Sequence, residues 1–208
     1  QFGNHYGIAN HKGVLKSKDV KNILDLAFKN GISFIDTAKS YGNSEKIIGD
    51  IISNSNQKWN VVTKFNNSSY SLKDQYKSSE NNLRMIPYAV LSHSYDDYTN
   101  LPFYKFLKKL KKDNKIKKIG VSVYTAKQIE SILNTHKPDL IQCPLNILDT
   151  ELYKSGVLDK VKNEGIEIHA RSIFLQGLFY LSKSKIKKKF PDLTNVVDQL
   201  DSISKEAN

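Results

Sequence analysis

The sequence predicts an α/β fold in which strands and helices alternate along the chain and the strands form a parallel sheet. Six short stretches rich in β-branched residues are typical of strands that are buried on both faces. Amphipathic segments lie between them, and this alternation indicates βαβ units. The predicted strands are SFIDTA (33–38), WNVVTKF (59–65), YAVLSH (88–93), KKIGVSVY (117–124), DLIQCPLN (139–146) and GIEIHARS (165–172).

Capping residues delimit the helices that we expect between these strands. Ser17 precedes the segment KDVKNILDLAFKN, which Gly31 ends. Thr125 precedes AKQIESILNTH, and Gly165 closes VLDKVKNE. Ser and Thr are favoured N-caps, and Gly is favoured just after a helix.

The stretch FYKFLKKLKKDNKIKKIG combines an apolar stripe with many lysines. We interpret it as an outer helix with a solvated cationic face, and a membrane-surface or nucleic-acid patch is the alternative. The residues of the apolar stripe are Phe103, Phe106, Leu107 and Leu110.

The spacing of the strands favours a closed barrel over an open nucleotide-binding sheet. An eight-unit barrel averages ~31 residues per unit, and the strand starts fall close to that spacing. The glycine-rich phosphate loops of open sheets, GxGxxG and GxxxxGK[ST], do not occur in the sequence. A further clipped strand near Gln1 brings the expected count to about seven. We therefore predict one domain over residues 1–208, a parallel (β/α)8 barrel that is about one βα unit short.

The composition narrows the possible partners. The chain has 208 residues, of which 39% are hydrophobic and 25% charged, proportions typical of a globular protein. No apolar run approaches the roughly 20 residues of a membrane span, and the start resembles no secretory signal. The formal net charge is +11, but only Arg84 and Arg171 are arginines, the residue on which nucleic-acid recognition depends most. We expect a soluble cytoplasmic protein with no membrane or nucleic-acid partner.

The cysteine and histidine content argues against a metal centre and disulfides. Cys143 is the one cysteine, which excludes an intramolecular disulfide and a cysteine-rich metal site. The five histidines show no metal-ligand spacing with carboxylates or with that cysteine.

Four polar residues stand at or just after the C-terminal ends of three consecutive predicted strands, where parallel barrels place their catalytic groups. Asp36 closes the first strand and Tyr41 follows it, while Lys64 and His93 close the next two. Taken one at a time, each residue also has a purely structural explanation. Asp36 could cap a turn, Lys64 could form an ion pair and His93 could be a buried core residue. Tyr41 is one of 11 tyrosines in the chain.

Jointly the four residues fit the reduction of a carbonyl group. An unperturbed phenol has a pKa near ~10, and an adjacent ammonium is expected to lower the pKa of Tyr41. A carboxylate keeps that ammonium charged and oriented. An imidazole can donate a hydrogen bond to the carbonyl oxygen and stabilise a developing alkoxide. The set provides a general acid and an oxyanion site, and needs a hydride donor.

The string GISFIDTAKSYGNSEKIIG resembles the aldo-keto reductase signature, in which Asp-Thr-Ala is followed by Tyr-Gly-x-Ser-Glu. The segments VVTKF, VLSHS, KIKKIGVSVY, DLIQCPLN and IEIHARSIFLQGL continue the resemblance in order. It implies a TIM barrel that reduces aldehydes or ketones, possibly sugar-derived, with NADPH. It also implies that this chain lacks the eighth strand and helix at the C-terminal end of the barrel. By motif position, the implied catalytic tetrad is Asp36, Tyr41, Lys64 and His93, with Tyr41 as the proton donor.

The resemblance also implies a set of cofactor-binding residues. The Ser of GVSVY and the Gln of LIQCP match a pair that hydrogen-bonds the nicotinamide carboxamide, and ARSIFLQG matches a loop along the pyrophosphate. The alternatives are that the Ser of GVSVY caps the end of its strand and that ARSIFLQG is an ordinary turn from strand to helix. Val123 stands where many members have Asn, and the Arg of ARSIF where many have an aromatic residue that stacks on nicotinamide. The implied residues are Ser122, Gln142, Arg171, Ser172, Leu175 and Gly177.

Two other functions stay open. The chain could hold a cofactor without turnover, as a regulatory protein or an inactive truncated form. It could also be a Schiff-base barrel, which requires Lys64 in an apolar pocket without Asp36 beside it.

Three aromatic residues follow His93, namely Tyr95, Tyr98 and Phe103. They either line an apolar substrate pocket or pack a loop against a helix.

Overall fold

The computed structural model describes residues 1–67 and 70–206. The chain divides into two compact units, each described here by itself. The first comprises Gln1–Tyr6 and Lys12–Ile173, and the second comprises Gly7–His11 and the chain from Phe174 onward. The expectation of a single domain stays a prediction.

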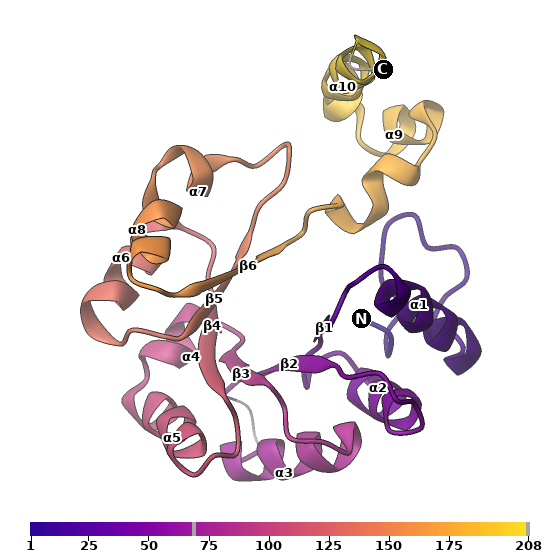
Figure 1. Ribbon diagram of the computed structural model, residues 1–208. Helices are drawn as coiled ribbons and strands as arrows, with labels where there is room; N and C mark the ends of the chain where they lie inside the picture. The colour runs from indigo at the N-terminus through magenta and orange to yellow at the C-terminus, as the bar shows by residue number, and fades with distance from the viewer. Residues whose placement is uncertain (68–69, 207–208) are drawn as a thin grey trace. The chain divides into compact units, whose positions relative to one another are not determined.

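The first unit is built on a curled sheet of six parallel strands (Figure 1). The strands follow one another in sequence order, and each pairs with its neighbours in the chain, as in a barrel. This arrangement confirms the predicted alternation, and the sheet has the form of a partial (β/α)8 barrel. The strands are β1 (Phe34–Asp36), β2 (Asn60–Phe65), β3 (Ala89–Ser92), β4 (Lys118–Ser122), β5 (Leu140–Pro144) and β6 (Glu167–Arg171).

The predicted seventh strand near Gln1 is wrong. Within the described residues the sheet has six strands, and Gly3 forms an isolated bridge with Gly42 instead. Gly3 packs so closely on this loop that a Cβ atom there would collide with the carbonyl oxygen of Tyr41. The start of the chain therefore packs against the loop that carries Tyr41, and it does not pair with β1.

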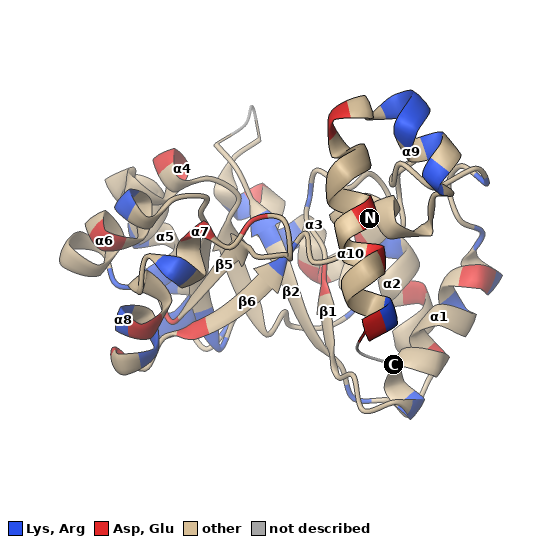
Figure 2. Ribbon diagram, turned by 90° about the horizontal axis from the view of Figure 1, so that it is seen from above, with Lys and Arg blue, Asp and Glu red and all other residues tan. Residues whose placement is uncertain are grey.

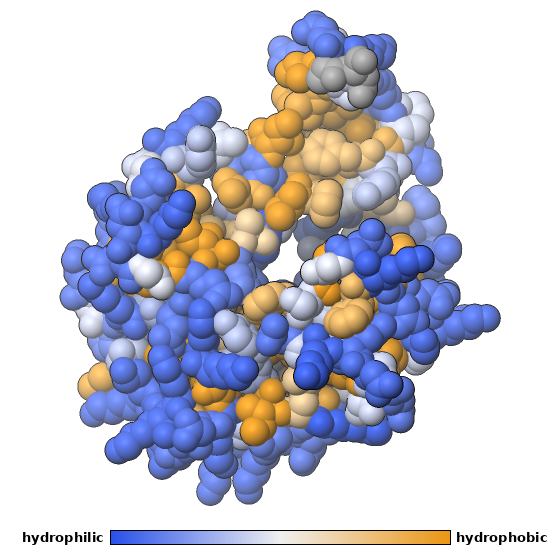
Figure 3. Space-filling model, in the orientation of Figure 1, coloured by the Kyte–Doolittle hydropathy of each residue, from blue (hydrophilic) through white to orange (hydrophobic). Residues whose placement is uncertain are grey.

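Helices lie on the outer side of the sheet, and mostly hydrophilic residues cover the surface of this unit in the view of Figure 3. Each helix turns an apolar face inward, as in other βα units. The helices are α1 (Ser17–Lys29), α2 (Ser44–Ile52), α3 (Leu72–Leu83), α4 (Tyr95–Thr99), α5 (Leu101–Lys112), α6 (Ala126–Thr135), α7 (Glu151–Lys154) and α8 (Val157–Asn163).

Three of the four helix-capping predictions are confirmed. Gly31 follows the end of α1 with a φ of +82°. Thr125 caps α6, and together with Gln128 it forms a full capping box. Gly165 follows α8 with a φ of +69°, in the left-handed region that glycine adopts without strain. The prediction for Ser17 is wrong, because α1 begins at Ser17 itself and Lys16 occupies the N-cap without a side-chain hydrogen bond.

The main core lies between the sheet and α3 to α8. The predicted stripe of α5 packs into it, with Phe103, Leu107 and Leu110 buried and Phe106 partly buried, while the lysines of the helix are exposed. Tyr98 and Phe103 are fully buried in this core, and the hydroxyl of Tyr95 donates a hydrogen bond to Ser131. These three aromatic residues therefore pack loop against helix. The pocket-wall alternative is wrong for Tyr98 and Phe103, which are fully buried.

Side chains across the inside of the curled sheet connect strands that are not neighbours. The ring of Phe34 on β1 packs edge-on against His169 on β6, with 5.4 Å between ring centroids. Lys118 on β4 forms an ion pair with Glu167 on β6, which also accepts a hydrogen bond from Tyr88. The first and last strands therefore approach each other near the N-terminal ends of the strands.

The second unit contains η1 (Leu175–Tyr180), α9 (Lys183–Lys189), η2 (Pro191–Leu193) and α10 (Thr194–Glu206). A small core holds it together, formed by Leu178, Leu181, Ile186 and Val197. Lysines cover much of α9 (Figure 2). The last helix of this unit, α10, is described as far as Glu206.

No helix among the described residues is long and apolar enough to span a membrane. The same part of the chain contains no group of three or more His, Cys, Asp or Glu residues that could hold a metal ion.

Gly49 makes the close packing of α2 against α3 possible, and replacing it with Ala is expected to destabilise the first unit. An added Cβ atom would collide with the carbonyl oxygen of Asn82 and lie 2.8 Å from the backbone of Leu83. Overpacking of this kind costs about 1–3 kcal/mol, which outweighs the better helix propensity of Ala. Urea unfolding should show the loss, whereas Lys46→Ala on the exposed face of α2 should change stability little. Equal stability of G49A and the parent chain would contradict the close packing.

Candidate active site

The candidate catalytic residues lie where the sequence predicts them, at the C-terminal ends of β1, β2 and β3. Asp36 is the last residue of β1, Lys64 the next-to-last residue of β2, and His93 follows directly after β3. Tyr41 lies in the loop between β1 and α2. In a parallel barrel these ends open on one mouth, where loops and strand ends can gather around a substrate.

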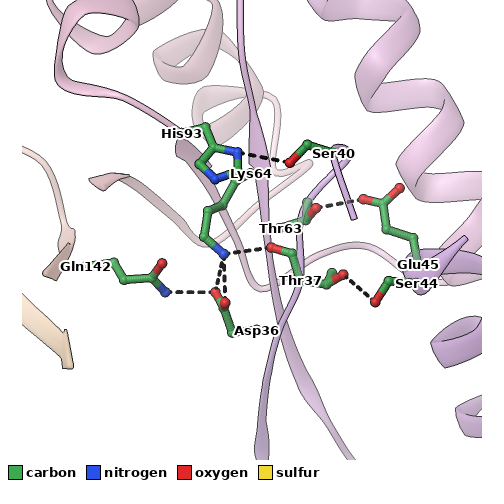
Figure 4. Close-up of polar contacts among 9 residues, drawn as sticks. All are labelled: Asp36, Thr37, Ser40, Ser44, Glu45, Thr63, Lys64, His93 and Gln142. Atoms are coloured by element: carbon green, nitrogen blue, oxygen red, sulfur yellow. Dashed lines mark hydrogen bonds and ion pairs between the residues drawn. The ribbon is translucent and has the colours of Figure 1, made fainter. Parts of the chain in front are cut away.

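The centre of the site is an ion pair between Lys64 and Asp36 (Figure 4). Lys64 Nζ lies 2.7 Å from each carboxylate oxygen of Asp36 and 2.8 Å from the carbonyl oxygen of Thr37. The Lys64 side chain is 1% exposed and the Asp36 side chain 42% exposed. Burial lowers the pKa of Lys64, and the attraction of Asp36 opposes that change. An ammonium has three protons to donate, and these three acceptors use all of them.

Tyr41 and His93 complete the cluster. The Nζ atom of Lys64 lies 5.1 Å from the centroid of the Tyr41 ring, and the rings of Tyr41 and His93 meet edge to face with centroids 5.9 Å apart. The structure therefore brings all four predicted residues together.

The protonation of Tyr41 differs from the expectation. Burial first, and then the nearby carboxylate of Asp36, raise the pKa of Tyr41 to about 12. The prediction of a lowered pKa is wrong, because the burial of the phenol and the negative charge of Asp36 outweigh the effect of the neighbouring ammonium. The phenol consequently keeps its proton at neutral pH, which is the state that a proton donor needs.

His93 is held neutral by its surroundings. Burial first, and then the positive charge of Lys64, lower the pKa of His93 below its usual value. Its Nδ1 atom lies 3.3 Å from the hydroxyl of Ser40, a contact that no sequence pattern predicts. When the Ser40 hydroxyl donates to Nδ1, the ring proton resides on Nε2 and can be donated to a carbonyl oxygen.

Gln142 joins this cluster from β5. Its Nε2 atom donates to Asp36 Oδ1 at 2.8 Å, so that the carboxylate is shared between two donors (Figure 4). Its Oε1 atom is buried and has no hydrogen-bond partner among the described residues. Ser122, also buried, is the register partner of Gln142 on the adjacent β4. An unpaired buried oxygen is costly, and a ligand N–H would satisfy it.

Arg171 and Ser172 lie at the end of β6. The guanidinium of Arg171 stacks on the ring of Tyr124 at 4.2 Å from the ring centroid, and its Nη1 atom donates to Ser172 Oγ at 3.2 Å. Val123 is buried in the main core, so this departure from the family pattern is a packing residue here. Ser172 itself has a φ of +62°, in the left-handed region that few non-glycine residues adopt.

The remaining two predicted cofactor residues, Leu175 and Gly177, belong to the second unit. Both lie in η1 in the left-handed region, with φ values of 47° and 89°. Within this unit, the backbone N–H of Gly177 donates to the carbonyl oxygen of Phe174.

The geometry does not meet the condition for a Schiff-base lysine. That chemistry requires a neutral amine in an apolar pocket, whereas Lys64 contacts both oxygens of Asp36. The arrangement can instead hold a protonated phenol and a neutral imidazole side by side, next to a fixed ion pair. Such a pair of donors can bind a carbonyl oxygen and transfer a proton to it.

Comparison with known proteins gives consistent results. The model of the Aldo/keto reductase family matches residues 2–207. An aldo-keto reductase from Strobilurus tenacellus is 26% identical over 94% of this chain and 67% of its own length. One from Gibberella moniliformis is 27% identical over 75% of this chain, which spans 52% of that protein.

Solved structures with the same fold are found as well. The glycerol dehydrogenase from Gluconobacter oxydans superposes with a TM-score of 0.75 at 20% identity, over 99% of this chain and 72% of that one. An aldo-keto reductase from Klebsiella pneumoniae, solved in complex with NADPH, gives a TM-score of 0.69 at 18% identity, over 80% of this chain and 63% of that one.

Proposed function

The chain belongs to the aldo/keto reductase family, and from that premise we propose that it reduces an aldehyde or a ketone to an alcohol with NADPH. The observation that carries the proposal is the cluster of Tyr41 and His93 beside the Lys64–Asp36 ion pair. The substrate is a small carbonyl compound, and sugar-derived aldehydes and ketones belong to this class.

Each residue of the cluster has a definite task in this reaction. The carbonyl oxygen accepts hydrogen bonds from the phenol of Tyr41 and from the imidazole of His93, which stabilise the negative charge that develops on it. The phenol then gives its proton to the oxygen as the alcohol forms. Asp36 holds Lys64 in place, and the ammonium lies against the Tyr41 ring, where it stabilises the phenolate that remains.

NADPH, when bound, supplies the hydride. The residues present fit its nicotinamide, because Gln142 offers a buried oxygen without a partner among the described residues, and a carboxamide N–H can donate to it. Ser122 lies next to Gln142 on the neighbouring strand, and Arg171 and Ser172 follow at the end of β6. The NADPH-bound relative from Klebsiella pneumoniae supports this choice of cofactor.

A fluorescence titration of the chain with NADPH and with NADH tests the proposal. We expect saturable binding that is tighter for NADPH, followed by carbonyl-dependent loss of NADPH absorbance with a panel of aldehydes and ketones. NADPH binding without turnover of any carbonyl would favour the regulatory alternative. Lack of binding to either nucleotide would contradict the proposal for this chain.

Gln142→Leu is expected to weaken NADPH binding by about tenfold, since it removes the buried oxygen that would accept the carboxamide N–H and leaves a donor unpaired. The same titration measures the loss. Since Gln142 also donates to Asp36, thermal unfolding must show that the variant is folded. Unchanged affinity in a folded Q142L variant would remove Gln142 from the cofactor site.

A further inference from the structure

The helix α2, which follows the Tyr41 loop, carries a carboxylate on its buried face. Glu45 is 2% exposed and shares that face with Ile48, Gly49 and Ile52. Burying a carboxylate costs much free energy unless it is paired and hydrogen-bonded. The mechanism above gives Glu45 no task, so that its burial calls for another explanation.

Every oxygen of this carboxylate has a partner. Glu45 Oε1 accepts hydrogen bonds from the hydroxyl of Thr63 at 2.6 Å and from the hydroxyl of Ser79 at 2.7 Å. Glu45 Oε2 lies 3.3 Å from Lys39 Nζ, which also donates to Ser78 Oγ at 2.8 Å. The bond between Thr63 and Glu45 is drawn in Figure 4.

These contacts join three parts of the fold around the active site. Lys39 lies in the loop between β1 and α2, two residues before Tyr41. Thr63 lies on β2 directly before Lys64, with its side chain on the opposite face of the strand, and Ser79 lies on α3. The carboxylate therefore fastens the loop that carries the phenol to the strand that carries the ammonium.

Further bonds hold the same loop. The backbone N–H of Lys39 donates to the carbonyl oxygen of Lys64, Thr37 Oγ1 donates to Ser44 Oγ, and Gly3 bridges Gly42. The side chain of Lys39 adds contacts to the two helices that follow, through Glu45 on α2 and Ser78 on α3.

We propose that Glu45 is a positioning residue, which sets the place of the Tyr41 phenol against Lys64 by holding Lys39, Thr63 and Ser79 together. The inference rests on the proposed function, because it concerns the geometry of proton transfer. A misplacement of about 1 Å can cost as much as 100-fold in rate, so a small shift of this loop has a large effect on turnover.

The variant that isolates this role is Glu45→Gln. Its amide oxygen can still accept from Thr63 and Ser79, while its amide nitrogen faces Lys39 and abolishes the ion pair. We expect kcat to fall about tenfold, with KM for the carbonyl substrate and the affinity for NADPH within twofold of the parent chain. Glu130→Gln is the matched control, because it removes an exposed carboxylate that pairs with Lys160, and its kcat should not change.

Lys39→Met removes the other partner of the same ion pair. It should lower kcat to a similar extent, and the double variant E45Q/K39M should lose little more than either single variant, because both changes remove one interaction. Additive losses in the double variant would overturn the proposed link through Lys39. A fall in melting temperature with unchanged kcat, measured well below the unfolding transition, would show that Glu45 supports the fold alone and would overturn the proposal.

Amide hydrogen exchange of residues 38–44 separates this inference from the proposed function, since it needs no substrate. E45Q should exchange faster in this loop while the strands stay protected. If the parent chain reduces no carbonyl, the proposed reaction fails while faster loop exchange still supports the role of Glu45 in holding the loop. Unchanged exchange in E45Q would overturn that role even in an active enzyme.

Discussion

Tyr41→Phe is expected to lower carbonyl turnover at least about 100-fold while leaving NADPH binding and the fold intact. A positioned general acid contributes roughly 100- to 10,000-fold, and Phe keeps the ring while removing the transferable proton. The ring contacts with Lys64 and His93 do not need the hydroxyl. Steady-state kinetics at neutral pH and an NADPH titration of both proteins measure the two quantities.

The control for this experiment is Tyr153→Phe, which removes a hydroxyl from an exposed tyrosine on α7. Its turnover should equal that of the parent chain. Retained turnover in Y41F would remove Tyr41 as the proton donor, whereas equal loss of NADPH binding and turnover would assign it to cofactor binding instead.

Asp36→Ala is expected to cause the largest loss of stability among single substitutions in the site. It leaves the ammonium of Lys64 buried with one remaining acceptor, the carbonyl oxygen of Thr37. Breaking a buried ion pair from one side costs about 3–5 kcal/mol, and we expect a value near the lower end because Asp36 is 42% exposed. Urea unfolding followed by circular dichroism measures the change in the free energy of unfolding.

The double variant D36A/K64M decides whether the unpaired charge is the cause. With Met in place of Lys64, no buried ammonium remains, and part of the lost stability should return. Lys160→Ala, which breaks an exposed pair with Glu130, should change stability little. A double variant that is less stable than D36A would show that Lys64 stabilises the fold by packing and not by its pairing with Asp36.

Much of the fold could be predicted because its signals are local. The apolar stretches predicted all six strands, and Thr125 predicted the start of α6 because its side chain bonds to the backbone three residues later. The expected strand at Gln1 failed because a bridge to Gly42 depends on how a distant loop packs, which no local pattern records.

In the candidate site, too, some features follow from local sequence and others depend on how distant segments pack. Strand ends predicted the positions of Asp36, Lys64 and His93, because parallel strands end on one mouth of a barrel. The pKa of Tyr41 could not be predicted in this way, because it depends on how deeply the fold buries the phenol and on how near it brings Asp36. The role of Ser40 beside His93 likewise depends on the path of a loop.

No prediction from the sequence included Glu45, although its place on the helix held a signal. A charged residue that shares a helical face with Ile48 and Ile52 is unusual, because such faces are buried. Its partners Thr63 and Ser79 come from other elements and are known only from the fold.

The strictly sequential order of the strands has a consequence for folding during synthesis. Each strand pairs with the one made just before it, so that the sheet can grow as the ribosome releases the chain, without waiting for distant segments. Asp36, Tyr41, Lys64 and His93 all belong to the first three strands and their loops, whereas Gln142 joins Asp36 only after 106 further residues. The proton-transfer group can therefore assemble early in translation, and the part that would receive the nucleotide is added to it afterwards.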